Sequence, residues 1–149
     1  MIETADGKGY TVLKKLFHYP YKVTWKEDIV MIDLNLDLNK EMIEKIKVEA
    51  TEMIKEIMLP DLIQVILYGS CVRGDYRADS DVDIALLTKC NRYEAKKYDK
   101  EHAKIATELA MKYFAVVNLV SFPYDEFLEK KTWYSYFRNI DAEGEILYG

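Results

Sequence analysis

The fold of this chain is decided by one stretch, Leu67-Tyr68-Gly69-Ser70-Cys71-Val72-Arg73-Gly74-Asp75-Tyr76-Arg77-Ala78-Asp79-Ser80-Asp81-Val82-Asp83-Ile84. The stretch joins two short apolar runs, 62–68 and 82–87, which have the length and the β-branched content of buried strands. Gly69-Ser70 ends the first run abruptly and opens what we expect to be a helical turn. Two neighbouring strands joined through a turn and a polar loop are therefore predicted.

The Gly69-Ser70 pair has the outline of a phosphate site. Glycine lets a ligand approach the backbone closely, and the free N–H groups at the start of a helical turn favour an anion, with the serine hydroxyl as a further donor. On its own, a Gly-Ser pair after a strand is more typical of an ordinary turn.

Asp81 and Asp83 begin the second strand two residues apart. Side chains alternate along a strand, so both carboxylates are predicted to face the same side while Val82 and Ile84 face the other. Two like charges this close repel each other unless a cation intervenes, and Mg²⁺ is commonly shared between one or two carboxylates and substrate phosphates. A pair of exposed aspartates at a strand entrance is the structural alternative.

The combination is more specific than its parts. A strand that ends in Gly69-Ser70, ten intervening residues and a D-x-D pair at the start of an apolar strand resembles the DNA polymerase β-like nucleotidyltransferase superfamily. With Arg73-Gly74 and Ser80 in place, the chain is similar to the minimal nucleotidyltransferases, small bacterial and archaeal proteins often encoded beside a HEPN-domain partner. The resemblance spans about residues 39–149, and its specific motif lies within 67–87.

The resemblance implies roles for the residues that match. Gly69 and Ser70 would hold the phosphates of a nucleoside triphosphate such as ATP, and Asp81 and Asp83 would bind Mg²⁺. Arg73 and Arg77 would reach the triphosphate, because guanidinium groups match phosphate geometry. The alternative for both arginines is solvation at the surface or an ion pair with Asp75 or Asp79.

The pattern departs from the superfamily at its third carboxylate, which catalytic members carry on the following strand. Here that strand reads Val116-Val117-Asn118-Leu119-Val120, and Asn118 stands at the matching position. An amide can coordinate a cation through its oxygen but cannot act as a base. Asp125 and Glu126 follow Pro123 and are interpreted as residues of a helix start.

Two functions of different class follow. The first is a Mg²⁺-dependent nucleotidyltransferase that transfers a nucleoside monophosphate, AMP from ATP, to a hydroxyl of a protein or small molecule. The second is a weak or inactive nucleotidyltransferase-fold module that acts as an antitoxin-like partner of a HEPN-domain protein. The sequence leaves the acceptor, the base preference and a homo-oligomeric state open.

The rest of the chain predicts an α/β (α+β) fold with a small mixed sheet and helices packed mainly on one face. We expect a helix that begins after the N-cap Asn39 and stops at Pro60, a long helix over 93–113, a strand over 115–120 and a last helix over 134–143 capped by Gly144. Residues 39–149 form the predicted nucleotidyltransferase domain, and residues 1–38 are an N-terminal extension of unclear role.

Composition narrows the partners and the setting. The 149 residues include 21 basic and 26 acidic ones, a net charge of −5, which disfavours nucleic acid because phosphate neutralisation needs a basic patch. Two isolated cysteines, Cys71 and Cys90, and the lack of a leader pattern predict a reduced, cytoplasmic setting. No apolar run approaches the roughly 20 residues that span a bilayer, so no membrane segment is expected.

Overall fold

The computed structural model describes residues 21–26, 29–34 and 36–149, and the chain divides into two units, residues 1–36 and 37–149. The first unit contains β1 (Tyr21–Lys26) and β2 (Ile29–Leu34), which pair antiparallel. The interpretation of residues 1–38 as an extension falls largely on residues outside the described ones.

Helix α2 (Lys40–Met58) opens the second unit. The Asn39 side chain accepts a hydrogen bond from the backbone N–H of Met42, at 3.1 Å, so the predicted N-cap is confirmed. The helix ends two residues before Pro60, as expected for a residue that cannot continue a helix. Its apolar stripe is buried, with Ile46 and Ile54 fully excluded from solvent.

Four strands form one mixed sheet in the order β5-β4-β3-β6. They are β3 (Leu62–Tyr68), β4 (Val82–Thr88), β5 (Val117–Pro123) and β6 (Glu145–Tyr148). Strand β4 pairs antiparallel with β3 and parallel with β5, and β6 pairs antiparallel with β3. The predicted α+β class with a small mixed sheet is therefore confirmed.

The parallel pair requires a crossover, and the chain builds it from three helical pieces rather than the single long helix that the sequence predicted. These are α4 (Arg92–Ala95), a 3₁₀ turn η1 (Lys96–Tyr98) and α5 (Asp99–Tyr113). A capping box starts α4, in which Asn91 and Glu94 satisfy each other's backbone N–H groups. The 3₁₀ turn then lets the chain change direction before α5 begins.

One further prediction needed correction. Strand β5 begins at Val117 and runs on to Pro123, whereas the sequence placed it over 115–120. Proline is tolerated there because β5 is an edge strand, where one side of the backbone needs no partner. The predicted C-cap Gly144 is confirmed: its N–H donates to the Ile140 carbonyl oxygen, and its backbone is extended, with φ −66° and ψ 143°.

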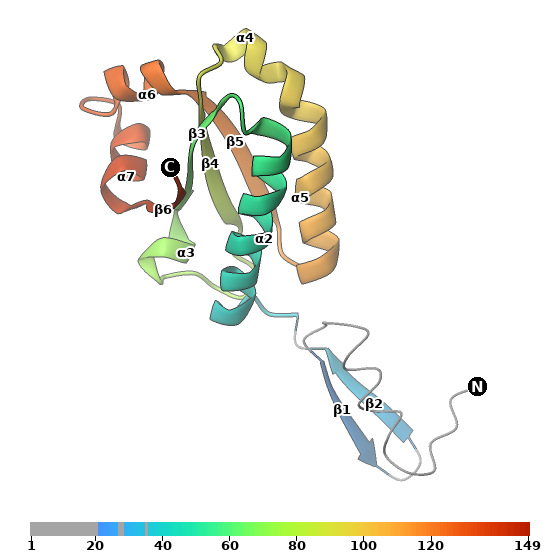
Figure 1. Ribbon diagram of the computed structural model, residues 1–149. Coiled ribbons are helices and arrows are strands. Elements are labelled where there is room, and N and C mark those ends of the chain that lie inside the picture. Colours follow the sequence, from blue (N-terminus) through green and yellow to red (C-terminus); the bar gives the residue numbers. More distant parts are fainter. Residues whose placement is uncertain (1–20, 27–28, 35) are drawn as a thin grey trace. The chain divides into compact units, whose positions relative to one another are not determined.

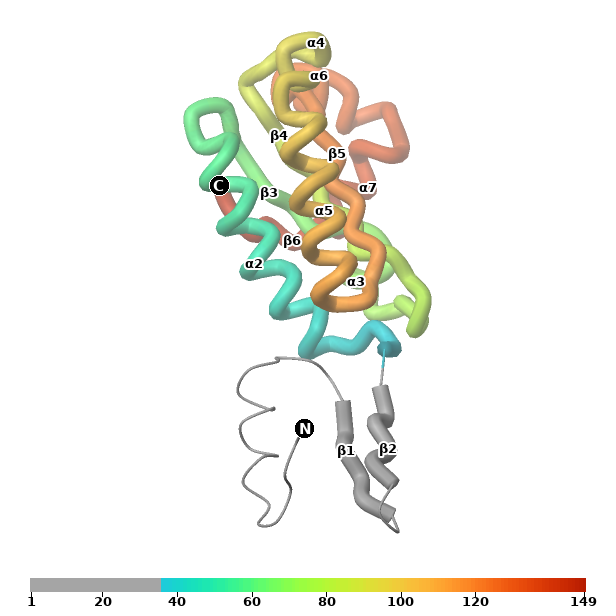
Figure 2. The backbone as a smooth tube through the Cα atoms, turned by 90° about the vertical axis from the view of Figure 1, so that its right-hand side faces the viewer, coloured from blue at the N-terminus to red at the C-terminus, as the bar shows by residue number. Residues whose placement is uncertain are grey.

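Each face of the sheet is covered by its own helices (Figure 1). The two longer helices, α2 and α5, pack on one face around a core that includes Val65, Ile84 and Leu109. The shorter helices α6 (Tyr124–Lys130) and α7 (Ser135–Glu143) cover part of the other face, where Phe137 and Ile140 are buried. The tube in Figure 2 shows α2 and α5 lying side by side in front of the sheet.

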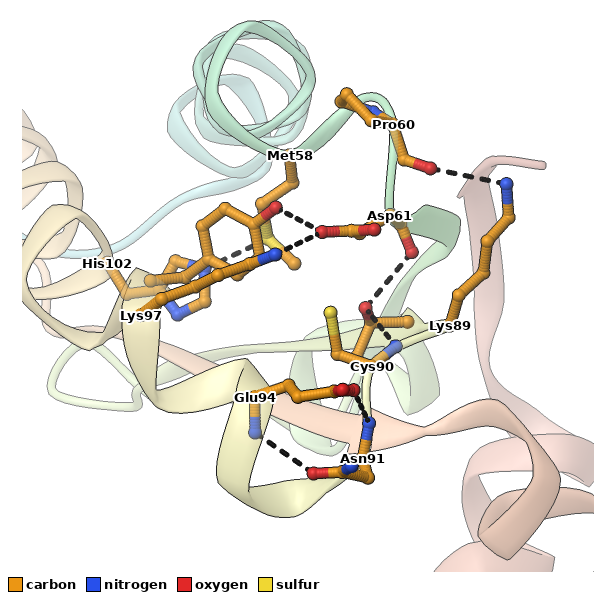
Figure 3. Close-up of polar contacts among 11 residues, drawn as sticks. Met58, Pro60, Asp61, Lys89, Cys90, Asn91, Glu94, Lys97 and His102 are labelled. Carbon is orange, nitrogen blue, oxygen red and sulfur yellow. Dashed lines mark hydrogen bonds and ion pairs between the residues drawn. The ribbon is translucent and has the colours of Figure 1, made fainter.

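Polar contacts anchor the crossover where β3 begins (Figure 3). The Asp61 carboxylate accepts hydrogen bonds from Lys97 Nζ and from the Tyr98 hydroxyl, each at 2.6 Å. The hydrogen bond from Lys97 is the main reason why the pKa of Asp61 falls to about 2. The buried His102 ring lies with Nε2 3.0 Å from Met58 Sδ. These contacts tie the start of β3 to η1, and the end of α2 to α5.

One end of the sheet brings together the residues that the sequence singled out. The carboxyl end of β3 and the amino ends of β4 and β5 meet beside the short helix α3 (Ser70–Arg73). In Figure 1 this end lies in the lower part of the domain, away from α4 and α6. Within the described residues, none of the helices combines the length and the apolar character that a membrane crossing requires.

Candidate functional site

Three polar side chains converge at this end of the sheet. Asp83 pairs in register with Asn118 of β5, so their side chains share a face, and Asp81 lies two residues earlier on the same side. The Asn118 amide Nδ2 donates to Asp81 Oδ2 at 3.2 Å and to Asp83 Oδ1 at 2.8 Å. One amide group therefore bridges the two carboxylates that the sequence singled out.

The backbone at Gly69 passes close to the same carboxylates. Its φ of 79° and ψ of −153° lie in a region that is essentially restricted to glycine. A Cβ atom built on Gly69 would lie 2.9 Å from Asp83 Oδ2. Glycine is thus needed twice at this position, for its conformation and for the space that the Asp83 carboxylate occupies.

Ser70 opens the helical turn that the sequence predicted, and α3 brings it to the end of β3. The turn is closed by hydrogen bonds from the N–H groups of Val72 and Arg73 to the Gly69 carbonyl oxygen. Ser70 is half-buried, and it lies beside the Gly69 backbone that approaches Asp83. The predicted phosphate-binding pair and the predicted metal-binding pair are therefore neighbours in space.

The two arginines behave differently. Arg73 is exposed, and its guanidinium forms ion pairs with Asp75 at 3.3 Å and with Glu143 at 3.6 Å. This is the ion-pair alternative that the sequence offered for Arg73. Arg77 is also exposed, and its backbone N–H donates to Ser80 Oγ at 2.8 Å. Among the described residues its guanidinium has no ion pair, so it is the freer of the two cations.

Tyr68 and Tyr136 complete the wall of the site, and sequence reasoning missed them. Tyr68 pairs in register with Asp83 on the side opposite Asn118, and its hydroxyl lies 2.7 Å from the hydroxyl of Tyr136 on α7. Burial, followed by this hydrogen bond, raises the pKa of Tyr68 well above its usual value. The phenol therefore stays protonated and can donate a hydrogen bond at neutral pH.

The surroundings of Cys71 and His102 favour a packing role. Burial and the nearby Asp83 carboxylate raise the pKa of Cys71, and its thiol donates to the Asp81 backbone oxygen at 3.4 Å. Burial lowers the pKa of His102, which packs against Met58 and Tyr98. A thiol and a neutral ring of this kind serve packing rather than catalysis.

The donor set fits a shared magnesium ion and not a cage made by protein alone. Among the described residues, no group of three or more histidine, cysteine, aspartate or glutamate side chains gathers in a way that could hold a metal. Two carboxylates and one amide do gather, however, and Mg²⁺ is commonly bound by one or two carboxylates that leave the remaining positions to phosphate oxygens and water. Asn118 can supply a neutral ligand once its amide releases the carboxylates.

Comparison with known proteins identifies a family and two relatives that match part of the chain. The family model described as a nucleotidyltransferase domain matches residues 43–140. A curated protein of Methanocaldococcus jannaschii, named as a candidate protein adenylyltransferase, is 34% identical over 86 residues, which is 57% of this chain and 77% of that protein. A second protein of the same name and organism is 38% identical over 78 residues, or 52% of this chain and 76% of its own length.

Solved structures give a weaker likeness. A Shewanella oneidensis complex of a tri-AMPylated HEPN toxin with an MNT antitoxin aligns with a TM-score of 0.46 and 18% identity, over 72% of this chain and 72% of the matched chain. A likeness of this size carries no conclusion about partner or activity.

We expect Gly69→Ala to destabilise the domain more than Gly74→Ala. Both glycines have a positive φ, 79° and 78°, but nothing lies within 4 Å of a Cβ on Gly74. Gly74→Ala should lower the free energy of unfolding by about 1–2 kcal/mol, and Gly69→Ala by more than about 2 kcal/mol. Urea unfolding of both variants measures the difference, and equal losses would contradict the close approach of Gly69 to Asp83.

Proposed function

Since this chain belongs to the nucleotidyltransferase domain family, we propose that it is a magnesium-dependent enzyme that transfers AMP from ATP to a hydroxyl group. The observation that carries the proposal is the convergence of Asp81, Asp83 and Asn118 beside the Gly69-Ser70 turn. Carboxylates next to a Gly-Ser turn at the end of a strand are the arrangement that a metal–triphosphate complex requires.

Binding is divided among the residues of the turn, the strand and the loop. The Ser70 hydroxyl and the backbone around Gly69 donate to phosphate oxygens, while Asp81 and Asp83 hold Mg²⁺ through their carboxylates. Arg77 adds positive charge at the outer phosphates, and Arg73 does so when it leaves Asp75. Magnesium, when bound, would neutralise charge on the triphosphate and lower the pKa of the attacking hydroxyl.

The residues of the chain position the transfer and receive its proton. An acceptor oxygen attacks the α-phosphorus, a bond forms between them, and the bond from the α-phosphorus to the bridging oxygen breaks to release pyrophosphate. The hydroxyl proton passes to a carboxylate oxygen of the Asp81–Asp83 pair, since the amide of Asn118 cannot accept it. The Tyr68 hydroxyl, in register beside Asp83, can donate to an oxygen of the reacting phosphate.

A protein hydroxyl is the acceptor class with the best support, ahead of a small molecule. Both archaeal relatives are named as candidate protein adenylyltransferases. The net charge of −5 argues against nucleic acid. The two free cysteines, Cys71 and Cys90, support a reaction in the reducing cytoplasm.

We expect Mg²⁺-dependent binding of a non-hydrolysable ATP analogue, measured by calorimetry. The double variant Asp81→Ala/Asp83→Ala should weaken it at least tenfold, a loss of about 1.4 kcal/mol. Asp79→Ala is the matched control, because it removes an exposed carboxylate from the same loop without touching the pair. No binding by the native protein, across ATP, GTP, CTP and UTP analogues, would reject the enzyme.

The second candidate is a binding module that recognises a HEPN-domain protein without turnover. The observation that favours it is the amide at Asn118, where catalytic members of the superfamily carry a third carboxylate. In this case the bridge from Asn118 to Asp81 and Asp83 would replace the metal and keep the site closed.

The variant Asn118→Asp separates the two candidates. If the native protein is an enzyme adapted to the amide, we expect the rate of label transfer from α-labelled ATP to differ between Asn118→Asp and the native protein by less than about tenfold. A tenfold difference corresponds to about 1.4 kcal/mol in the activation free energy. A rise of a hundredfold or more would favour the binding module. The unfolding temperature of Asn118→Asp should also be lower than that of the native protein in the presence of a chelator, because three like charges then meet without an amide between them. Addition of Mg²⁺ should restore the unfolding temperature.

A further inference from the structure

Strand β5 presents an open backbone edge next to the site. The Val82 N–H donates to the Val116 carbonyl oxygen at 2.8 Å, which fixes the direction of every backbone group along the strand. Asn118, Val120 and Phe122 therefore point their N–H and C=O groups toward β4, and the alternate residues point theirs outward. Those outward residues are Val117, Leu119 and Ser121.

The outward groups have no hydrogen-bond partner within the part of the chain that the structure describes. Strand β5 pairs with β4 alone there, at one end of the sheet order. Pro123, the next residue on the outward side, has no N–H to offer. An unpaired edge of this kind is a template for an added strand.

A groove of about 630 Å³ runs along this edge and reaches the site. At one end it is lined by Tyr68, Asp83 and Asn118, and farther along by the outward residues of β5. Its opposite wall comes from α4 and α5, where the alanines 95, 103 and 106 leave room beside the strand. The groove is therefore continuous from the carboxylates to the open edge.

A buried polar atom lies in the same groove. Among the described residues, Ser121 Oγ is excluded from solvent and has no hydrogen-bond partner. A buried hydroxyl without a partner is costly, so Ser121 combines, within the described residues, an unpaired side-chain oxygen with an unpaired outward backbone.

We propose that an extended segment of the protein acceptor binds as an additional strand on the outer edge of β5. The segment pairs with the backbone of Val117, Leu119 and Ser121, and a hydroxyl-bearing side chain opposite Asn118 reaches the Asp81–Asp83 pair. This inference rests on the proposed transfer function and specifies its substrate, a segment recognised through its backbone. An added strand lies about 4.8 Å from β5, so its residue opposite Asn118 lies next to the reacting phosphate.

The first test is hydrogen exchange of the full chain, followed by NMR. In the free protein the amides of Val117, Leu119 and Ser121 should exchange at least a hundredfold faster than those of Asn118 and Val120, which pair with β4. Equal protection of both sets would overturn the proposal, because the edge would then be covered by the chain itself or by a second copy.

The second test uses seven-residue peptides of alternating glutamine and valine around a central serine, threonine or tyrosine. We expect label transfer from α-labelled ATP to at least one peptide. Methylation of one alternate set of its backbone amides should abolish labelling, while methylation of the other set preserves it. Failure to label any peptide, or an equal response to both sets, would overturn the proposal.

A groove variant separates this inference from the proposed function. Ala103→Trp fills the groove, whereas Glu108→Trp places the same ring on an exposed part of α5 outside the groove. We expect only Ala103→Trp to reduce peptide labelling, by at least tenfold, with unchanged affinity for the magnesium–ATP analogue. Loss of analogue binding by the native protein would reject the function itself, and equal labelling by both variants would reject the docking edge alone.

Discussion

Two carboxylates at the start of β4, Asp81 just before the strand and Asp83 within it, impose the constraint on which the rest of the site depends. Asp81 and Asp83 are close enough to repel each other, and a group of opposite polarity has to lie between them. In this structure the Asn118 amide does so, with one nitrogen bonded to both carboxylates. A hydrogen-bonded amide can give way to a cation, as the proposed function requires.

The sheet holds these groups with little freedom. The register of β4 with both neighbours sets Asp83 between Tyr68 and Asn118, and Val82 and Ile84 are fully buried on the opposite face. Gly69 then brings the backbone against the Asp83 carboxylate, where any side chain would collide. Rigid strands and one glycine thus fix the positions that a loop could not hold.

Much of this was predictable from local chemistry. The two apolar runs around Gly69-Ser70, the N-cap Asn39 and the shared face of Asp81 and Asp83 all follow from short-range patterns. The break of the crossover helix was not predictable, because its helical spacing continues across the 3₁₀ turn at 96–98. The end of β5 was also missed, because proline usually signals a strand's end unless the strand is known to lie at an edge.

Contacts between distant elements were beyond the sequence. Nothing local to Tyr68 indicates that α7 returns to place Tyr136 against it. The pairing of Arg73 with Glu143 likewise depends on the return of the last helix. Such contacts depend on tertiary packing, which local patterns do not encode.

In the proposed function, Asp81, Asp83 and Asn118 hold a metal–triphosphate complex beside Gly69. Paramagnetic broadening by Mn²⁺, added with a non-hydrolysable ATP analogue, tests it most directly in NMR spectra of the full chain. A complex at this position would selectively broaden the Asn118 side-chain amide and the Gly69 backbone amide, and would leave the Lys89 amide, beyond the opposite end of β4, unaffected. Uniform broadening, or none at Asn118 and Gly69, would contradict it.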